Sequence, residues 1–345
     1  PRTEPSAYPK VSVIVPALNE AHTVEAGLTS VLAQNYPNFE VVALNDRSTD
    51  ATGAVLERMN AAHPQLRVVH ITELPAGWLG KNHALQRGAE QAGGDWLLFT
   101  DADVRLATGT LRAAVAYALR EDLDHLTAVP HMEAKSPWLG SFVGAFMLLF
   151  SFGILRASGP RSGVYVGLGA FNLLRRSVYR EVGGHEPIAL RPDDDMRLGR
   201  LVKRAGFRQA VVLATDLVQV EWYESVRGAV RGLNKNAFAG LYYSLPLVLL
   251  FTGTLLLTHV WPFAAIFVVG GAAQALYGFV LLNLLFVYAV GSRLTRLPFA
   301  YVALHPVGTL ILVYAVWEAA FRATVGGGIE WRGTFYRLEE LKRGR

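Results

Sequence analysis

Short apolar runs alternate with longer amphipathic segments along the N-terminal part of the chain. Runs of β-branched and other apolar residues at positions 10–16, 39–44 and 66–71 predict three strands. The segments that follow them carry turn residues and then apolar positions at helical spacing, as in the helix expected at 84–92. Because each connection between parallel strands is right-handed and covers one face, this alternation predicts an α/β protein with a Rossmann-like, mostly parallel sheet and helices on both faces.

A fourth apolar run, Trp96–Phe99, is followed closely by two carboxylates, Asp101 and Asp103. Large apolar residues bounded by glycines on one side and by acids on the other are typical of a central strand of a parallel sheet. Ligands of such sheets bind beyond the carboxyl ends of the strands, where two carboxylates can bind a divalent cation together with phosphate oxygens. An isolated Asp-x-Asp is more often a solvated turn, so this interpretation depends on the remaining residues.

The middle of the chain continues this pattern and adds one unusual segment. We expect a helix at residues 108–120, a further strand at 126–131, and one or two strands at 209–222. The segment at 137–155 is strongly apolar and carries no charge. It fits a buried helix and a helix in the membrane interface equally well, so both interpretations stay open.

Three consecutive acids, Asp193, Asp194 and Asp195, open a predicted helix that continues to about Ala205. Acids are favourable at a helix N-terminus through the helix dipole and through capping, and this explains one or two of them. Three acids exceed what capping requires, which makes this turn a candidate site.

A basic helix is expected at residues 224–238, with Arg227, Arg231 and Lys235 on one face at helical spacing. This stripe could bind a diphosphate or lipid headgroups. Charged faces of this kind are more often simply solvated, so both roles stay open.

Beyond residue 240 the chain becomes almost entirely apolar. Three stretches, at 242–258, 262–290 and 299–321, are long enough to cross a hydrocarbon core of about 30 Å. We therefore expect three parts: a soluble domain at 1–239, a membrane domain at 240–322 and a basic tail at 323–345.

The charges that flank these stretches indicate conflicting topologies. The loop at residues 292–296 is basic and is therefore expected on the cytoplasmic side. With a cytoplasmic soluble domain, three spans would place the tail on the other side of the membrane. The tail nevertheless carries the basic residues Arg332, Arg337, Lys342, Arg343 and Arg345. A re-entrant or split segment would reconcile the number of spans with the charge rule.

Composition narrows the class of protein. The chain is 52% hydrophobic, too apolar for an ordinary soluble enzyme, and its +5 net charge is scattered, so nucleic acid is not an expected partner. It has no cysteine, which excludes disulfides, thiolate metal sites and thiol nucleophiles. It lacks a Gly-x-Gly-x-x-Gly turn after the first strand and a Walker sequence, which argues against dinucleotide oxidoreductases and P-loop ATPases. It opens without a secretory signal or an initiator Met, which leaves room for an upstream membrane anchor.

Five motifs together resemble the family-2 glycosyltransferases, a family with the GT-A fold. They stand in the family's order: Pro16-Ala-Leu-Asn-Glu20 after the first apolar run, Asn45-Asp46-Arg-Ser-Thr-Asp50, Gly80-Lys81-x-x-Ala84-Leu85, Asp101-x-Asp103, and Asp194-Asp195-x-x-Leu198. A less specific resemblance concerns the Gly183-Gly184 segment, the tail from Trp331 to Tyr336 and the trailing spans. These resemble membrane-bound members that glycosylate lipids such as carotenoids and hopanoids.

The resemblance implies positions for the sugar donor and for a metal ion. The loop residues Pro16, Leu18, Asn19 and Glu20, together with Asp46, would cradle the base and ribose of the nucleotide. Lys81 would lie near the nucleotide, and Asp101 and Asp103 would hold Mg²⁺ or Mn²⁺ on the diphosphate, with Asp103 the more direct ligand. The alternative roles are a turn or cap residue for Asp46 and a surface cation for Lys81.

The resemblance also implies a general base. Asp195 matches the family's base and Asp194 is its neighbour, and adjacent acids would raise one another's proton affinity. Processive polysaccharide synthases carry Gln-x-x-Arg-Trp just before their spans, and the corresponding region at 221–227 lacks it. Chain elongation is therefore less expected, and Arg227 or Arg231 would replace the missing arginine at the diphosphate.

The resulting prediction is an inverting, metal-dependent transfer of a sugar from a nucleotide sugar, expected to be a UDP-sugar, to a hydroxyl or carboxyl group of a membrane lipid. The protein would be a multi-pass protein of the plasma membrane with its catalytic domain on the cytoplasmic side. The alternatives are a processive polysaccharide synthase, a polyprenyl-phosphate glycosyltransferase and, from another class, a membrane scaffold or transport protein with an inactive transferase domain. Intact acids argue against the last alternative: Asp46, Asp101, Asp103 and Asp195.

Overall fold

The computed structural model describes residues 7–157, 163–331 and 333–343, so Arg332 and Arg345 of the predicted basic tail lie outside the described residues. Contacts divide the chain into two compact units. The first, the sheet unit, comprises residues up to His131 together with Gly153–Val220. The second, the helical unit, comprises Met132–Phe152 and Glu221–Arg343. The domain limits expected from the hydropathy pattern stay a prediction.

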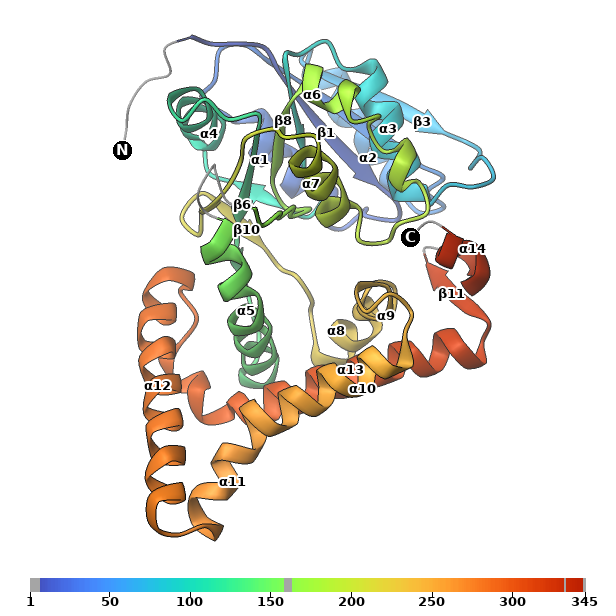
Figure 1. Ribbon diagram of the computed structural model, residues 1–345. Helices are drawn as coiled ribbons and strands as arrows, with labels where there is room; N and C mark the ends of the chain where they lie inside the picture. The colour runs from blue at the N-terminus through green and yellow to red at the C-terminus, as the bar shows by residue number, and fades with distance from the viewer. Residues whose placement is uncertain (1–6, 158–162, 332, 344–345) are drawn as a thin grey trace. The chain divides into compact units, whose positions relative to one another are not determined.

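A seven-stranded sheet forms the core of the sheet unit, with the strand order β3-β2-β1-β4-β8-β6-β9. Figure 1 labels its strands β1, β3, β6 and β8. β8 pairs antiparallel with β4 and β6, and the other neighbouring strands pair in parallel. The mostly parallel α/β sheet predicted from the sequence is therefore confirmed. The strands are β1 (Val11–Ala17), β2 (Phe39–Asp46), β3 (Leu66–Ile71), β4 (Trp96–Phe99), β6 (His125–Val129), β8 (Asn172–Arg175) and β9 (Gln209–Leu213).

Buried apolar residues explain why these runs form central strands. Every residue of β1 and β4 is buried, which is the pattern of strands covered on both faces. The register aligns Val11 of β1 with Phe39 of β2 and with Trp96 of β4. Because these strands run in the same direction, Asp46 and the residues after Phe99 lie at one edge of the sheet, the edge formed by the carboxyl ends.

Helices cover both faces of this sheet. α3 (Gly80–Gln91), α6 (Arg176–Glu181) and α7 (Asp194–Arg204) share one apolar core with β1, β2, β4 and β8. α1 (Val24–Leu32) and α2 (Thr52–Ala62) connect strands that step in the opposite direction along the sheet. Right-handed crossovers therefore place α1 and α2 on the face opposite α3.

The sheet unit contains further elements, most of them short. β5 (Arg105–Leu106) pairs antiparallel with β10 (Val218–Val220), so the region predicted as one or two strands at 209–222 forms two. α4 (Thr110–Arg120) packs against β6, and the short helix η1 (Glu186–Ile188) precedes α7. β7 (His131–Met132) lies where the chain passes from the sheet unit to the helical unit.

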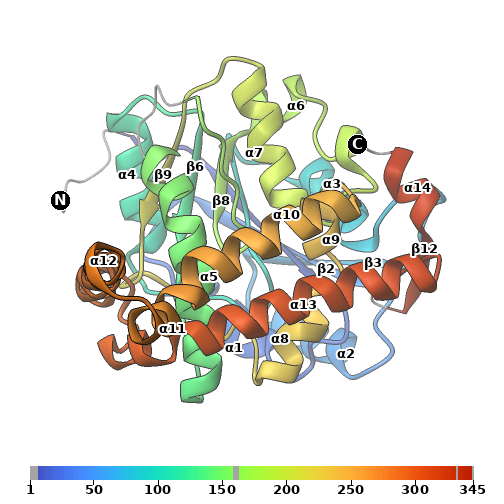
Figure 2. The ribbon, with the colours of Figure 1, turned by 60° about the horizontal axis from the view of Figure 1, so that its bottom comes forward.

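Three long apolar helices dominate the helical unit, and each is long enough to cross a membrane. The first combines α10 (Leu245–Leu255), the π-helical turn η2 (Leu256–Val260) and α11 (Trp261–Val268). The second is α12 (Gly271–Thr295). The third combines η3 (Phe299–Leu304) with α13 (His305–Val325), and α10 runs beside α13 (Figure 2).

The first two apolar helices meet at a different place from the one predicted, and the predicted span at 262–290 is wrong. Pro262 stands in the first turn of α11, where proline is tolerated, so the first long helix continues past it to Val268. The chain then turns at Gly270 and Gly271, and Gly271 has a φ of +62°, which favours glycine. Hydropathy does not reveal this break, because two glycines hardly change the apolar character of the run.

α5 (Pro137–Ala157), the uncharged apolar segment of the sequence, lies for most of its length in the helical unit. A Cβ on Gly144 would lie 3.1 Å from the Tyr288 hydroxyl, and one on Gly308 of α13 would overlap the main chain of α5. Phe142 of α5 is fully buried, whereas Trp138 is 55% exposed. Residues 139–145 are all buried, so the N-terminal half of α5 is a buried helix, as one of the two interpretations predicts, whereas Trp138 and Phe150 on either side of this stretch are exposed.

The remaining elements of the helical unit depart from the sequence pattern. The basic helix expected at 224–238 is broken into α8 (Val226–Leu233) and α9 (Ala237–Gly240). An antiparallel hairpin that the hydrophobic pattern did not predict follows α13 and leads into a short helix. Its elements are β11 (Gly328–Trp331), β12 (Thr334–Arg337) and α14 (Leu338–Arg343).

Candidate active site

Asp46 ends β2 at the carboxyl edge of the sheet and is fully buried. Both of its carboxylate oxygens accept from the neighbouring Arg47, whose Nε lies 2.8 Å from Oδ1 and whose Nη2 lies 3.0 Å from Oδ2. Arg47 has a φ of +58°, and its guanidinium lies where a Cβ on Gly80 would be. The carboxylate predicted to contact the nucleotide is thus held by an arginine that the sequence reasoning did not consider, although Arg47 stands directly after it.

The loop after β1 is tied to the loop after β2. Asn19 has a φ of +56°, and its Oδ1 accepts from the Thr49 N–H at 2.8 Å. Its own N–H donates to Ser48 Oγ at 3.1 Å. Pro16 lies within β1, and Leu18, the first residue after β1, is largely buried. These two residues therefore anchor the start of the loop in the core.

Asp101 and Asp103 follow β4 and lie among other charged groups. Lys81 Nζ, on the first turn of α3, is 2.8 Å from Asp101 Oδ1. Burial, followed by the charges of Asp101 and Glu20, raises the pKa of Asp103 to about 7. Asp103 therefore lies in the negative field of Asp101 and Glu20, where added positive charge would be stabilising.

Lys81 links these acids to those at the start of α7. Its Nζ lies 3.7 Å from Asp194 Oδ2, and its side chain is only 12% exposed. Burial by itself lowers the pKa of Lys81, but the nearby carboxylates of Asp101, Asp194 and Asp195 outweigh burial and raise that pKa. The ammonium group therefore stays charged at neutral pH.

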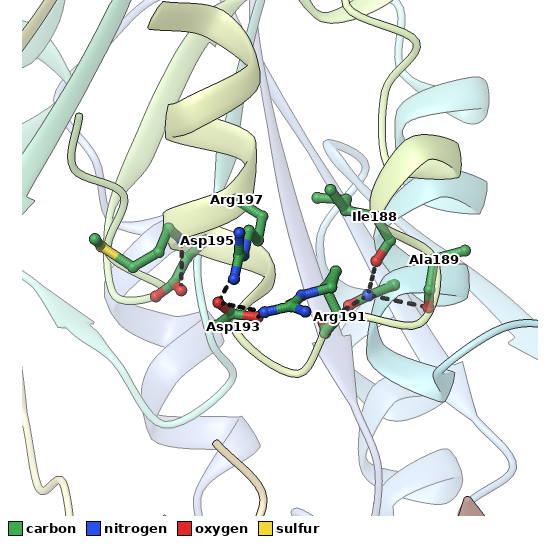
Figure 3. A network of polar contacts seen from close by, with 8 residues as sticks. Ile188, Ala189, Arg191, Asp193, Asp195 and Arg197 are labelled. Carbon is green, nitrogen blue, oxygen red and sulfur yellow. Dashed lines mark hydrogen bonds and ion pairs between the residues drawn. The ribbon is translucent and has the colours of Figure 1, made fainter. Parts of the chain in front are cut away.

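The three consecutive acids at the start of α7 have three different environments, and Figure 3 shows those of Asp193 and Asp195. Asp193 accepts from Arg191 Nε at 2.9 Å and from Arg197 Nε at 2.8 Å, so its charge is neutralised by arginines. Asp194 faces Lys81 and is buried. Asp195 is left without an arginine partner among these neighbours and points away from the Asp193 cluster (Figure 3).

The Asp195 carboxylate is oriented by main-chain donors. Its Oδ2 accepts from the Gly169 N–H at 2.8 Å, and its Oδ1 accepts from the Met196 N–H at 2.7 Å. Burial, followed by the charge of Asp194, raises the pKa of Asp195 to about 7, while Lys81 acts in the opposite direction. A carboxylate whose pKa lies near 7 can accept a proton at neutral pH and release it again.

One cavity brings the candidate groups of β4, α3 and α7 together. Asp46 and Asp103 are not among its lining residues, and Asp103 stands beside the cavity next to Asp101. Arg227 and Arg231 lie on α8 in the helical unit, so their predicted role at a diphosphate stays a prediction. The lining residues are Lys81, Leu85, Phe99, Thr100, Asp101, Gly169, Asn172, His185, Asp194 and Asp195.

His185 is a lining residue that sequence reasoning did not single out. Its main-chain N–H donates to Gln86 Oε1 at 3.0 Å, and its Nδ1 lies 2.7 Å from the Tyr179 hydroxyl. Burial, followed by the charge of Lys81, lowers the pKa of His185 to about 3, so its ring is neutral. The sequence signal for this position is the preceding Gly183-Gly184 pair, because both glycines have a positive φ, a conformation that favours glycine.

Comparison with known proteins identifies the family and the fold of this chain. The sequence profile of the family described as "Glycosyltransferase like family 2" matches residues 9–238, more than half of the chain. The structure of the mannosyltransferase PcManGT from Pyrobaculum calidifontis, solved in complex with GDP-mannose and Mn²⁺, superposes with a TM-score of 0.58 and 22% identity. The superposition covers 93% of this chain and 88% of PcManGT. At 22% identity the similarity concerns the fold, and it confirms the predicted GT-A-like fold.

Two curated relatives carry names that refer to lipids. The 4,4'-diaponeurosporenoate glycosyltransferase of Staphylococcus haemolyticus is 24% identical over 273 residues, which are 77% of this chain and 70% of that protein. The beta-monoglucosyldiacylglycerol synthase of Synechocystis sp. is 34% identical over 112 residues, which are 32% of this chain and 23% of that protein. Two Bacillus subtilis relatives, named "Probable glycosyltransferase YdaM" and "Putative teichuronic acid biosynthesis glycosyltransferase TuaG", are matched over only 23% and 36% of their own length.

Proposed function

Because this chain belongs to glycosyltransferase family 2, we propose that it transfers a sugar from a nucleotide sugar to a hydroxyl or carboxyl group of a membrane lipid. The observation that carries the proposal is the cavity lined by Lys81, Asp101, Asp194 and Asp195 at the carboxyl edge of the sheet, where open α/β sheets bind their ligands. The GDP-mannose bound to PcManGT supports a nucleotide-sugar donor. We expect a UDP-sugar for this chain.

The residues beyond β4 fit a divalent metal ion such as Mg²⁺ or Mn²⁺. Asp101 and Asp103 offer hard oxygen ligands, and a cation would stabilise the ionised form of Asp103, whose pKa is raised by burial and by the charges of Asp101 and Glu20. No group of three or more metal-ligating side chains occurs within the described residues, so diphosphate oxygens of the donor are expected to supply the remaining ligands. When bound, the ion supplies positive charge that makes the nucleoside diphosphate a better leaving group.

Asp195 and Lys81 have different roles in the transfer. Asp195 takes the proton of the acceptor hydroxyl while the hydroxyl oxygen bonds to the anomeric carbon. The bond from that carbon to the diphosphate breaks on the opposite side, so the anomeric configuration inverts and no covalent sugar-enzyme intermediate forms. Lys81, protonated beside Asp101, contributes positive charge as the diphosphate leaves.

A lipid acceptor is supported by the apolar helices and by the names of the two relatives. Large apolar side chains of the long helices are exposed, for example Phe267 at 86% and Leu257 at 68%, and such surfaces are stable in lipid rather than in water. The names of these two relatives refer to a diaponeurosporenoate and to a monoglucosyldiacylglycerol. We therefore expect a membrane-associated enzyme whose catalytic unit lies on the cytoplasmic side.

The test is a transfer assay with the full chain in detergent or proteoliposomes. It is incubated with a panel of labelled nucleotide sugars, a membrane lipid extract and Mg²⁺ or Mn²⁺, and the lipid products are separated. We expect one donor to label a lipid with a single sugar, in a reaction that chelation of the metal stops. Asp195→Asn should abolish transfer to a hydroxyl, whereas the exposed control Asp122→Asn should retain it.

The products distinguish the remaining alternatives. A sugar polymer would indicate a processive synthase, and a phosphate-linked sugar would indicate transfer to a polyprenyl phosphate. A lack of turnover with every donor, combined with a lack of nucleotide binding, would contradict a transferase and favour a scaffold.

A further inference from the structure

The first turn of α3 is tied to the segment that precedes α7. Asn82, which is fully buried, donates through Nδ2 to the carbonyl oxygens of Ile188 at 2.8 Å, Ala189 at 3.2 Å and Arg191 at 2.9 Å. The Leu79 N–H donates to the Ala189 carbonyl at 2.8 Å. The Asn82 amide thus binds three carbonyls of a segment more than a hundred residues away in sequence.

Arg191 continues this connection to the acids. It is only 1% exposed, and its Nε and Nη2 donate to Asp193 Oδ1 at 2.9 Å and Oδ2 at 3.1 Å. Arg197, one turn into α7, donates to the same carboxylate, so Asp193 lies between two guanidinium groups (Figure 3). Asp193 makes no capping hydrogen bond to α7, which means that its carboxylate is committed to these arginines.

The ends of this connection adjoin the groups of the cavity. Asn82 directly follows Lys81, and Asp193 directly precedes Asp194. Arg191 is the common member, because its carbonyl is held by Asn82 and its guanidinium holds Asp193. We call these three residues the Asn82–Arg191–Asp193 brace.

We propose that Arg191 is a positioning residue that, through the brace, sets the placement of Lys81 relative to Asp194 and Asp195. This inference rests on the proposed function of the cavity. Lys81 Nζ lies 3.7 Å from Asp194 Oδ2, beyond direct hydrogen-bond distance, so a displacement of about 1 Å decides whether the two groups form a hydrogen bond. A bidentate guanidinium fixes a carboxylate in both distance and plane, whereas a lysine ammonium would fix distance alone.

The proposal predicts a loss of rate rather than a loss of donor binding. Neither Arg191 nor Asp193 lines the cavity. Breaking the brace should shift Asp194 and Asp195, whereas Lys81 stays paired with Asp101 at 2.8 Å, so the donor should bind normally. Misplacement of catalytic groups by about 1 Å lowers rates by roughly 100-fold. Arg191→Gln should therefore lower kcat by about 100-fold and leave the donor KM within about twofold, and Arg191→Lys should recover about tenfold of that loss.

The experiment compares kcat and donor KM for wild type, Arg191→Gln, Arg191→Lys, Asp193→Asn and the double variant Arg191→Gln/Asp193→Asn. Because the two residues act as one unit, the double variant should lose no more activity than the more impaired single variant. Arg204→Gln is the matched control, because it removes one exposed arginine from the last turn of the same helix. Nucleotide affinity and melting temperature are measured for each variant.

The outcomes separate this inference from the proposed function. A kcat of Arg191→Gln within about twofold of the wild-type value would overturn the inference. It is equally overturned by a loss that appears in KM and melting temperature, or by additive losses in the double variant. If Arg191→Gln does not fold, Arg191→Lys carries the same kcat-against-KM comparison. Lack of activity in wild type with every donor would instead overturn the proposed function.

Discussion

Electrostatics at single residues determines what the cavity can do. Asp103 and Asp195 have pKa values raised to about 7 by burial and by neighbouring carboxylates, whereas Lys81 keeps its charge because three carboxylates surround it. The positions of these acids could be predicted from the sequence, because each follows a strand or opens a helix. Their protonation could not, since burial and the ion pair of Lys81 with Asp101 arise only when distant segments meet.

The raised pKa of Asp195 predicts how the rate depends on pH. A base must be ionised to accept a proton, so kcat for a hydroxyl acceptor should rise with pH through about 7 and level off above it. In Asp195→Asn, assayed at saturating metal so that Asp103 is ionised throughout, this dependence should vanish together with about 10²- to 10⁴-fold of the rate. A pH–rate profile of wild type measures this directly, and a flat profile between about pH 5 and pH 8 would rule out Asp195 as the base.

Gly169 offers a test of the close packing around Asp101. A Cβ at this position would lie 2.8 Å from Asp101 Oδ2 and 3.3 Å from Lys81 Nζ, so Gly169→Ala must displace one of them. We expect the donor KM to rise about tenfold, because the carboxylate is moved from its binding position. Gly163→Ala is the control, because no atom lies within 4 Å of its Cβ, and equal KM values for the two variants would contradict this account.

At the scale of elements, the sequence predicts those whose pattern is local. β1, β2, β3 and β4 lie where the apolar runs placed them, because each run is long and is buried in the sheet. β8 was missed because Asn172–Arg175 is short and has antiparallel partners far away in sequence. The Asp46–Arg47 pair and the brace were missed for a related reason, since nothing in the spacing indicates which charged side chains will be buried together.

Gly308 tests whether α5 is a packed element of the helical unit. Its Cβ would overlap the main-chain carbonyl of Ser141, so Gly308→Ala must separate α13 from α5. We expect this overpacking to lower stability by about 1–3 kcal/mol, measured as a lower melting temperature in detergent. Gly253→Ala in α10, whose Cβ meets no atom within 4 Å, should instead raise stability slightly through helix propensity. Similar shifts for both variants would show that α5 and α13 are not in close contact.

At the scale of the whole molecule, metal binding should be linked to folding and to pH. The folded pKa of Asp103 is raised, so without metal this carboxyl should contribute progressively less to stability as pH rises from about 4 to about 7, because the folded protein then retains a proton that the unfolded chain has released. A metal ion needs the ionised carboxylate, and its stabilisation should therefore be present above about pH 7 and fade below it.

Melting temperatures with and without Mn²⁺ test this linkage. At a free concentration of 100 times Kd we expect about 2.7 kcal/mol of added stability at pH 8 and far less at pH 5.5. Asp103→Asn should remove the effect at both pH values. An Mn²⁺ effect that is the same at both pH values, or that survives in Asp103→Asn, would show that the ion binds elsewhere.

The measurement that tests the central claim most directly compares donor affinity and transfer rate in two variants. If acids beyond β4 hold the donor through a metal ion and an acid of α7 accepts the proton, substitutions at the two places should affect donor binding and sugar transfer separately. Asp103→Asn should lose the metal-dependent part of nucleotide-sugar affinity, whereas Asp195→Asn should bind the donor as wild type does and transfer almost no sugar to a hydroxyl acceptor. Wild-type turnover by Asp195→Asn, or unchanged metal-dependent affinity in Asp103→Asn, would contradict the account.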